Sequence, residues 1–481
     1  MNIINKMLNK YKTLSLPVKA SLWYTICSIL NKGLALLSTP IFTRVMTEEQ
    51  YGQFSIFQSW YAILIIFTSL NIFLSGYQKG LLLFKDDAKR FTSSQLGLIV
   101  TITALFGVVY LAAPSFWSDF LQISPVLMLA MFAELFFMPA TELWSAQQRF
   151  DYKYKKNVIV TIFMTVFSIG VGILVVINTE YKTEARVYAD MLAKCLVGIL
   201  LFILLFGRGK TYYNKKYWKY ALGFNLPLIP HYLSNYILNQ SDRLMIGKLV
   251  GNAQAAYYSV AYTISSVILL IMNSVNNSLT PYIYKSIDSK EDKQIKNVAN
   301  LLVMLIACLC VGTMAFAPEV IYIFAGERYL DAIYVIPPVA LSVLFIFNYS
   351  LFSTIEYYYQ RTKLISAATC ICAGLNLILN FVFIKIYGYY AAGYTTLVCY
   401  IFLAFIHYLF YRKVLKEENI SEDIYDSKTI FVVSAVSIFL MIIMTIVYKK
   451  IVVRYAIVLI VLIALMLNRK KIKNILLEVK K

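Results

Sequence analysis

Long apolar stretches dominate this sequence and restrict what it can fold into. A helix that spans a membrane needs about 20 mostly apolar residues, because its backbone polar groups must hydrogen-bond within the segment. Seven stretches of about this length contain no charged residue: 51–78, 91–118, 158–178, 297–317, 332–355, 364–384 and 430–448. Seven more are apolar with isolated polar or ionisable residues: 20–43, 124–145, 189–206, 220–247, 254–284, 390–411 and 452–468. The sequence therefore predicts an all-α polytopic membrane protein with about 14 transmembrane helices.

Composition excludes the main soluble classes. Of the 481 residues, 60% are hydrophobic and 15% are charged, whereas soluble domains are about 45–50% apolar. No connection between the predicted spans is long enough to fold into a catalytic domain, so we expect no enzyme. The seven cysteines fall within predicted spans without the spacing of a metal site, so we expect buried thiols and no bound cofactor or metal.

Basic residues are distributed unevenly between the two sides of the predicted membrane. With the N-terminus inside, 33 Lys and Arg lie on the inner side and nine on the outer side, among the latter Arg186 and Arg454. This asymmetry favours a cytoplasmic membrane protein with both termini in the cytoplasm. The net charge of +20 then indicates contact with anionic membrane lipid, not with nucleic acid.

A short internal repeat suggests that the chain is duplicated. Thr43-Arg44-Val-Met followed by Tyr51-Gly-Gln-Phe-Ser resembles Asp242-Arg243-Leu-Met followed by Ala255-Ala-Tyr-Tyr-Ser. Six predicted helices separate the copies. We therefore expect a lobe of six helices at 1–210, a second at 211–415, and two appended helices with a basic tail at 416–481. Proline within both helices (Pro40; Pro227 and Pro230) predicts that each is bent or locally unwound.

Several motifs resemble one known family. They are Thr39-Pro-Ile-Phe-Thr-Arg44 with Tyr51-Gly-Gln-Phe-Ser55, Asn239-Gln-Ser-Asp-Arg-Leu-Met-Ile-Gly247, and Asn376-Leu-Ile-Leu-Asn380 through Tyr387-Gly-Tyr-Tyr-Ala-Ala-Gly393. Together they are similar to polysaccharide transporters, the O-antigen and capsule repeat-unit flippases of the multidrug/oligosaccharidyl-lipid/polysaccharide exporter superfamily. The resemblance covers residues 15–470. It implies a V-shaped, two-lobed carrier that moves polyprenyl-diphosphate-linked oligosaccharides outward by ion-coupled alternating access, and it leaves the sugar unidentified.

Basic residues inside predicted spans are candidate ligands for the diphosphate. A charge in the bilayer is costly unless it faces a cavity or a partner. Lys32 lies near the middle of the first span without an acidic residue one turn away. It is either a substrate ligand or the partner of Glu134 in the fourth span. Arg243, and Arg44 at the matching repeat position, are the other candidate diphosphate ligands.

Acidic residues in the spans are candidates for ion coupling or gating, with Na+ or H+ as the ion. Asp242 and Glu134 are the coupling candidates. Glu142 and Glu356 lie near the cytoplasmic ends of their spans, where a solvated helix end competes with a gating or interhelix role. Asp190 and Lys194 are four residues apart, which predicts an ion pair within one helix.

Three tyrosines complete the candidate site. Tyr51, Tyr257 and Tyr258 occupy repeat-matched positions and are candidate stacking surfaces for sugars. Two other functions stay open: an exporter of small cationic drugs from the same superfamily, and a membrane glycosyltransferase or polymerase. Expected partners are the lipid-linked oligosaccharide, anionic lipid and other membrane proteins of polysaccharide assembly.

Overall fold

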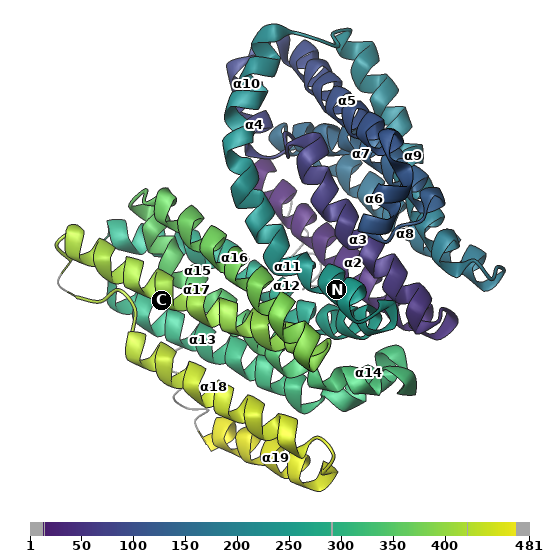
Figure 1. The fold of residues 1–481 in the computed structure, drawn as a ribbon. Coiled ribbons are helices and arrows are strands. Elements are labelled where there is room, and N and C mark those ends of the chain that lie inside the picture. Colours follow the sequence, from purple (N-terminus) through teal and green to yellow (C-terminus); the bar gives the residue numbers. More distant parts are fainter. Residues whose placement is uncertain (1–12, 14, 290–291, 421, 468–481) are drawn as a thin grey trace. The chain divides into compact units, whose positions relative to one another are not determined.

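The computed structural model describes residues 13, 15–289, 292–420 and 422–467. Throughout this part of the chain, all regular secondary structure is helical, with 18 α-helices (Figure 1). The chain divides into two compact units, residues 1–233 and 234–481. The predicted all-α polytopic fold is confirmed, and the lobe boundaries at 210 and 415 stay predictions.

Residues 1–233 form the first unit. Its helices are α2 (Leu16–Val45), α3 (Glu48–Ser69), α4 (Ser75–Leu83), α5 (Ala88–Ala112), α6 (Pro114–Leu121), α7 (Pro125–Phe150), α8 (Tyr154–Ile177), α9 (Lys182–Gly209), α10 (Lys215–Asn225) and the start of α11 (Ile229–Leu249). The packed helix pairs include α7 with α9, α8 with α9, and α2 with α8. Gly198 allows α9 its close approach to α7, because a Cβ atom there would lie 2.7 Å from the carbonyl oxygen of Phe137.

Residues 234–481 form the second unit. After the rest of α11, its helices are α12 (Asn252–Asp288), α13 (Asp292–Ala315), α14 (Ala317–Ala325), α15 (Ile336–Tyr358), α16 (Thr362–Tyr387), α17 (Tyr390–Glu417), α18 (Ser427–Val447) and α19 (Ile451–Leu467). Helix α17 packs against α15 and α16. The two appended helices belong to this unit, since α18 and α19 pack against α13 (Figure 1).

Each of the fourteen predicted spans contains one long helix. The helices α4, α6, α10 and α14 are short, with 8–11 residues, and α4 and α10 lie partly within the predicted spans 51–78 and 220–247. Within the described residues, eleven helices are long and apolar enough to cross a membrane. The other three predicted spans correspond to α3, α11 and α19. Helix α3 begins with a capping box, in which Thr47 accepts from the Gln50 amide and Gln50 accepts from the Thr47 amide, as helix starts commonly require.

Proline affects the two repeat-matched helices differently. Helix α2 continues through Pro40 without interruption. The predicted span at 220–247 is divided instead into α10, a 3-10 turn at Leu226–Leu228 that contains Pro227, and α11, which has Pro230 in its first turn. Local unwinding is therefore confirmed at Pro227, where proline removes a backbone donor.

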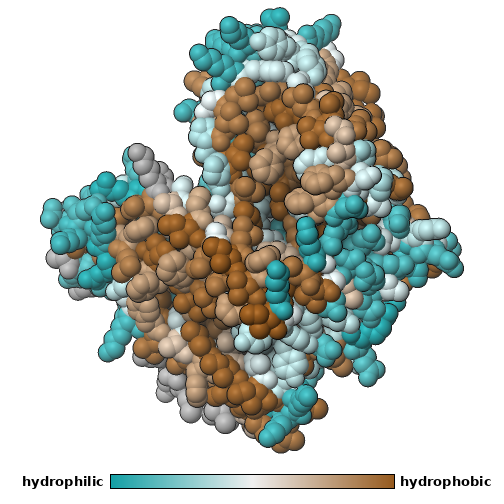
Figure 2. All heavy atoms as spheres, viewed as in Figure 1, coloured by the Kyte–Doolittle hydropathy of each residue, from teal (hydrophilic) through white to brown (hydrophobic). Residues whose placement is uncertain are grey.

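The long helices expose large apolar side chains that water would disfavour. Leu105, Ile159 and Leu200 are 60%, 67% and 63% exposed in the first unit, and Ile378 and Ile446 are 64% and 74% exposed in the second. Figure 2 shows apolar residues spread along the long helices and hydrophilic residues gathered at helix ends. Faces of this kind fit contact with lipid hydrocarbon.

The predicted topology can be tested by labelling single cysteines in a variant that lacks the native ones. Tyr213 and Glu327 are exposed residues, Tyr213 just before α10 and Glu327 just after α14. We expect Tyr213→Cys to react with an impermeant maleimide only after permeabilisation, and Glu327→Cys to react in intact cells. Reaction of Tyr213→Cys in intact cells would contradict the orientation. The basic tail at 469–481 lies outside the described residues.

Candidate functional site

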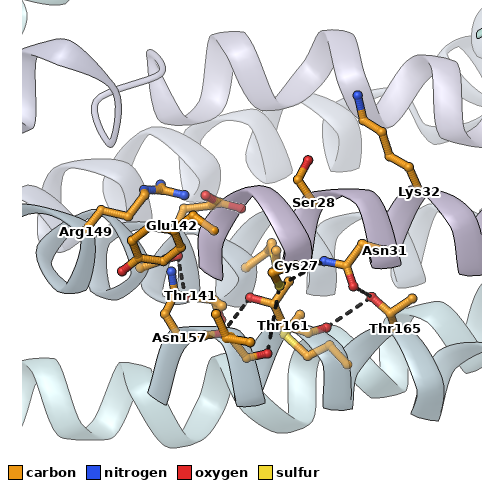
Figure 3. A pocket seen from close by; sticks show the side chains of 15 residues that line it. Cys27, Ser28, Asn31, Lys32, Thr141, Glu142, Arg149, Asn157, Thr161 and Thr165 are labelled. Atoms are coloured by element: carbon orange, nitrogen blue, oxygen red, sulfur yellow. Dashed lines mark hydrogen bonds between the residues drawn. The ribbon is translucent and has the colours of Figure 1, made fainter. Parts of the chain in front are cut away.

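A cavity of about 460 Å³ lies within the first unit, between α2, α7 and α8. Eleven of its fifteen lining residues are polar or charged. The polar lining residues are Tyr24, Ser28, Asn31, Lys32, Thr141, Glu142, Ser145, Arg149, Asn157, Thr161 and Thr165. We call this the N-unit pocket (Figure 3). A pocket so rich in hydroxyl and amide groups suits a ligand with many hydrogen-bonding groups.

Hydrogen bonds between helices fix the amide side chains of the N-unit pocket. The Ser145 hydroxyl of α7 donates to Asn157 Oδ1 of α8 at 2.7 Å. The Thr165 hydroxyl of α8 donates to Asn31 Oδ1 of α2 at 3.1 Å. Asn31 in turn donates to Cys27 Sγ at 3.8 Å. These contacts orient the wall before a ligand arrives, which lowers the entropic cost of binding.

The charged groups of the N-unit pocket lie at its two ends. Figure 3 shows Lys32 extending away from the hydrogen-bonded Asn31 and Thr165, while Glu142 and Arg149 lie side by side at the other end. Lys32 is exposed and forms no ion pair or hydrogen bond with the residues that the structure describes. The pocket thus contains two basic groups and one carboxylate, and the charge of Arg149 acts on Glu142.

The predicted ion pairs of the first unit are corrected by the structure. Glu134 of α7 is fully buried and accepts from Lys194 of α9 at 2.6 Å, so the alternative that paired it with Lys32 is wrong. Asp190 pairs with Arg186 at 2.8 Å, so the predicted Asp190–Lys194 pair is also wrong. The reason is that α9 begins at Lys182, not at the predicted residue 189, which places Arg186 one turn before Asp190.

Neighbouring side chains extend the Asp190–Arg186 pair into a buried polar network. Gln58 donates to Asp190 at 3.0 Å, and the Ser168 hydroxyl donates to the same carboxylate. The Arg186 guanidinium lies 4.4 Å from the centre of the Phe42 ring. Paired and stacked in this way, the charges of the network offset one another inside a largely apolar unit.

We expect the Glu134–Lys194 pair to support stability. Breaking a buried ion pair on one side costs about 3–5 kcal/mol, because the remaining charge loses its partner. Glu134→Gln should therefore lower the unfolding temperature in detergent, while Glu142→Gln on the same helix serves as the matched control. Adding Lys194→Met to Glu134→Gln should restore much of the loss. An unfolding temperature unchanged by Glu134→Gln would show that the pair contributes little.

A second polar cluster lies in the other unit, around Asp242 of α11. This carboxylate is fully buried. It accepts from Asn380 of α16 at 2.6 Å, from Thr396 of α17 at 2.9 Å and from the Tyr258 hydroxyl of α12. Among the described residues no cation pairs with it directly, which is unusual for a buried carboxylate. Four helices thus converge on one buried acid.

Further amide and hydroxyl groups surround that carboxylate. Asn376 donates to Thr396 at 3.1 Å and accepts from Asn380 at 3.1 Å, and Thr395 donates to Asn380. We name Asp242, Tyr258, Asn376, Asn380, Thr395 and Thr396 the C-unit cluster. Its oxygen atoms are of the kind that bind hard cations. In the sequence analysis these asparagines carried no role, although Asn376 and Asn380 are four residues apart in an apolar span and share a helix face.

The other predicted ligands have partners within their own units. Arg243 is nearly buried; its guanidinium contacts the Gln240 side chain and lies 4.4 Å from the centre of the Tyr262 ring. Arg44 is exposed, 3.4 Å from the carbonyl oxygen of Pro40. Neither Arg44 nor Tyr51 lines the N-unit pocket. Tyr257 packs against the rings of two other tyrosines, Tyr329 and Tyr389, at 5.4 and 5.8 Å.

Two charges are buried, one for which a solvated helix end was an open interpretation and one that was expected outside the membrane. Glu356 is fully buried and lies 2.7 Å from Nδ1 of His407, so the solvated helix end is wrong and an interhelix contact of α15 with α17 takes its place. Arg454, counted among the outer basic residues, is 1% exposed and bonds Glu319 of α14. Both partners were missed because they are distant in sequence.

Comparisons with known proteins agree on family and fold. A family described as "Polysaccharide biosynthesis protein" matches residues 18–287, more than half of the chain, and the MatE family matches residues 227–382. The "Lsg locus putative protein 1" of Haemophilus influenzae (strain ATCC 51907 / DSM 11121 / KW20 / Rd) is 25% identical over 149 residues, which cover 31% of this chain and 37% of that protein.

Two solved structures share the fold at low sequence identity. The lipid II flippase MurJ, in an inward closed conformation, has a TM-score of 0.70 and 14% identity, covering 94% of this chain and 100% of MurJ. An inward-facing multidrug resistance MATE transporter has a TM-score of 0.65 and 13% identity, covering 84% of this chain and 100% of that one. The chain therefore belongs to the polysaccharide biosynthesis protein family and shares the multi-pass fold of the MurJ and MATE structures.

Proposed function

We propose that this protein translocates polyprenyl-diphosphate-linked oligosaccharides across the bacterial cytoplasmic membrane for surface polysaccharide, such as capsule or O-antigen. The observation that carries this proposal is the N-unit pocket, which combines amide and hydroxyl side chains with Lys32 at one end, a lysine that has no ion-pair partner among the described residues. A diphosphate loses water on entering a pocket, and charge-assisted hydrogen bonds from Lys or Arg offset that loss. Hydroxyl and amide groups suit sugar hydroxyls.

The charge balance of the pocket favours an anionic ligand. Lys32 and Arg149 outnumber the one carboxylate, Glu142. A carrier of cationic drugs needs acidic groups without competing cations, since like charges disfavour binding. The lipid II flippase MurJ shares the fold, and this similarity supports a lipid-linked substrate.

We assign ion coupling to the C-unit cluster. Asp242 is buried without a directly paired cation among the described residues, and it is surrounded by neutral oxygen and amide groups. A proton or Na+ is therefore the natural counter-charge for this carboxylate. Glu134 is already paired with Lys194, so it is the weaker candidate of the two.

Deletion of the gene for this protein distinguishes the two transport functions. For the proposed function, the deletion strain should lose surface polysaccharide and accumulate lipid-linked oligosaccharide that is accessible only from the cytoplasmic side. Its sensitivity to cationic dyes and drugs should not change. Normal surface polysaccharide together with increased drug sensitivity would establish the exporter instead. A strain that lost polymer but accumulated finished, outward-facing repeat units would indicate a polymerase.

A further inference from the structure

Helix α10 presents two different faces. Tyr217, Ala221 and Asn225 are buried, and Tyr217 packs edge-on against Phe84 and Phe91. The residues of the opposite face recur at helical spacing and line a groove on the surface. Lys215, Trp218, Lys219, Leu222 and Gly223 lie along it, and Leu226 of the following 3-10 turn continues it. One face therefore packs α10 against α4 and α5. The other face is available to bind a ligand.

The open face borders a groove of about 580 Å³. Its two ends differ in chemistry. Lys215 and Lys219 lie toward the start of α10, whereas Leu222, Leu226 and Pro227 lie toward its end. At 1.5 Å per residue the helix carries this face over about 16 Å. The groove is thus cationic at one end and apolar at the other.

Two aromatic side chains, Tyr213 and Trp218, also line the groove. Trp218 Nε1 donates to the carbonyl oxygen of Ser94 at 2.9 Å, and the Trp218 ring meets Tyr213 edge-on at 4.8 Å. Trp and Tyr prefer the boundary between lipid headgroups and hydrocarbon. The position of α10 agrees, because it follows α9, an apolar helix of spanning length that ends at Gly209.

The two lysines of the groove have no acidic partner among the described residues. Lys215 and Lys219 are exposed and make no ion pair or hydrogen bond with residues that the structure describes. Lys216, in contrast, lies over the Phe84 ring on the other side of the helix. The segment 208–219 contains five basic residues and no acidic one, so the local potential is positive.

We propose that the α10 groove binds an anionic phospholipid, with its phosphate at Lys215 and Lys219 and an acyl chain along Leu222 and Leu226. A soluble anion would leave the apolar end of the groove exposed, and a zwitterionic lipid would leave the lysines unneutralised. A lysine near an anionic membrane surface favours binding by about fivefold. This lipid site is separate from the N-unit pocket. The lipid-site proposal therefore does not depend on the identity of the transported substrate.

The fluorescence of Trp218 reports on the groove. The purified full-length protein is placed in phosphatidylcholine nanodiscs that contain brominated phosphatidylglycerol or, at the same bromine content, brominated phosphatidylcholine. The chain has five tryptophans, so the Trp218 signal is the difference between the parent protein and Trp218→Phe. We expect at least about threefold stronger quenching by the anionic lipid. Equal quenching by both lipids overturns the proposal.

Variants separate the charged and apolar ends. Lys215→Gln with Lys219→Gln should bring the ratio of quenching close to one, whereas Lys155→Gln with Lys156→Gln, exposed lysines of α8, should leave it unchanged. A Cβ atom at Gly223 meets nothing within 4 Å. Gly223→Ala should therefore be tolerated, and Gly223→Leu should fill the groove and weaken quenching by both lipids.

Two results would contradict the site. One is a Lys215→Gln/Lys219→Gln variant that has the same unfolding temperature as the parent and also the same ratio of quenching by the anionic lipid to quenching by phosphatidylcholine. The other is relief of quenching by unlabelled polyprenyl diphosphate but not by excess phosphatidylglycerol, which would identify the groove as a contact for the substrate lipid.

Discussion

Lys32→Ala is expected to abolish surface polysaccharide while the protein reaches the membrane at its normal level. Lys32 lines the N-unit pocket, and among the described residues it has no acidic partner that its removal would leave unpaired. A charge-assisted hydrogen bond contributes about 1.5–3 kcal/mol, so translocation should slow by about 10- to 150-fold. Lys32→Arg keeps the charge but changes its geometry, and it should retain part of the activity.

The matched control for Lys32 is Lys155→Ala, which removes an exposed lysine of α8 outside the pocket. Protein level and unfolding temperature are measured beside surface polysaccharide for all three variants. Normal transport by Lys32→Ala would show that this lysine does not bind the head group. A variant that fails only because the protein is degraded would assign Lys32 a structural role.

Asp242→Asn should uncouple transport from the ion gradient. The substitution keeps the size of the side chain and removes the charge that a cation or proton would neutralise, at a position where four helices meet. Coupling between two sites typically amounts to about 1–3 kcal/mol, or about 5- to 150-fold. In proteoliposomes, the parent should be accelerated within this range by a Na+ or a proton gradient, and Asp242→Asn should not.

Asp331→Asn, an exposed carboxylate in the same unit, provides the control. Imposing the Na+ and proton gradients one at a time identifies the ion. Acceleration of Asp242→Asn equal to that of the parent would exclude the C-unit cluster from coupling. Tyr258→Phe removes one of the three donors to Asp242 and should shift the apparent affinity for the ion without abolishing coupling.

The positions of the long helices follow from the sequence because their cause is local. An apolar run of about 20 residues must form a helix in the bilayer whatever its neighbours are. Each of the fourteen predicted runs contains a long helix in the described chain, although short breaks interrupt some of them, such as residues 70–74 and 226–228. The unwinding at Pro227 has a similarly local cause. Family membership also depended on local motifs, which are read directly from the residues.

The pairing of the buried charges is determined by contacts between helices, not by local sequence. Glu134 meets Lys194, and Glu356 meets His407, across helices that are far apart in the chain. Helix periodicity gives the face on which a residue lies, but not which residue of another helix opposes it. The spacing of four residues between Asp190 and Lys194 predicted an ion pair within one helix. That prediction was wrong because Arg186 competes with the same spacing from the other side.

Residues without charge were the hardest to assign. Asn31, Asn157 and Thr165 give the N-unit pocket its polar wall, yet an isolated amide or hydroxyl in an apolar span gives a weak signal. Asn157, Thr161 and Thr165 do recur every four residues, which places them on one face of α8. That spacing was the available signal for this part of the site.

Translocation by the purified protein tests the central claim most directly. Proteoliposomes are loaded with a fluorescently labelled polyprenyl-diphosphate oligosaccharide, and its accessibility to an external reductant is followed over time with the parent and with Lys32→Ala. We predict that the parent exchanges the lipid between leaflets, and that Lys32→Ala does so about 10- to 150-fold more slowly, in keeping with the loss of a charge-assisted hydrogen bond. Exchange no faster than in protein-free liposomes, under either ion gradient, would contradict the proposed function.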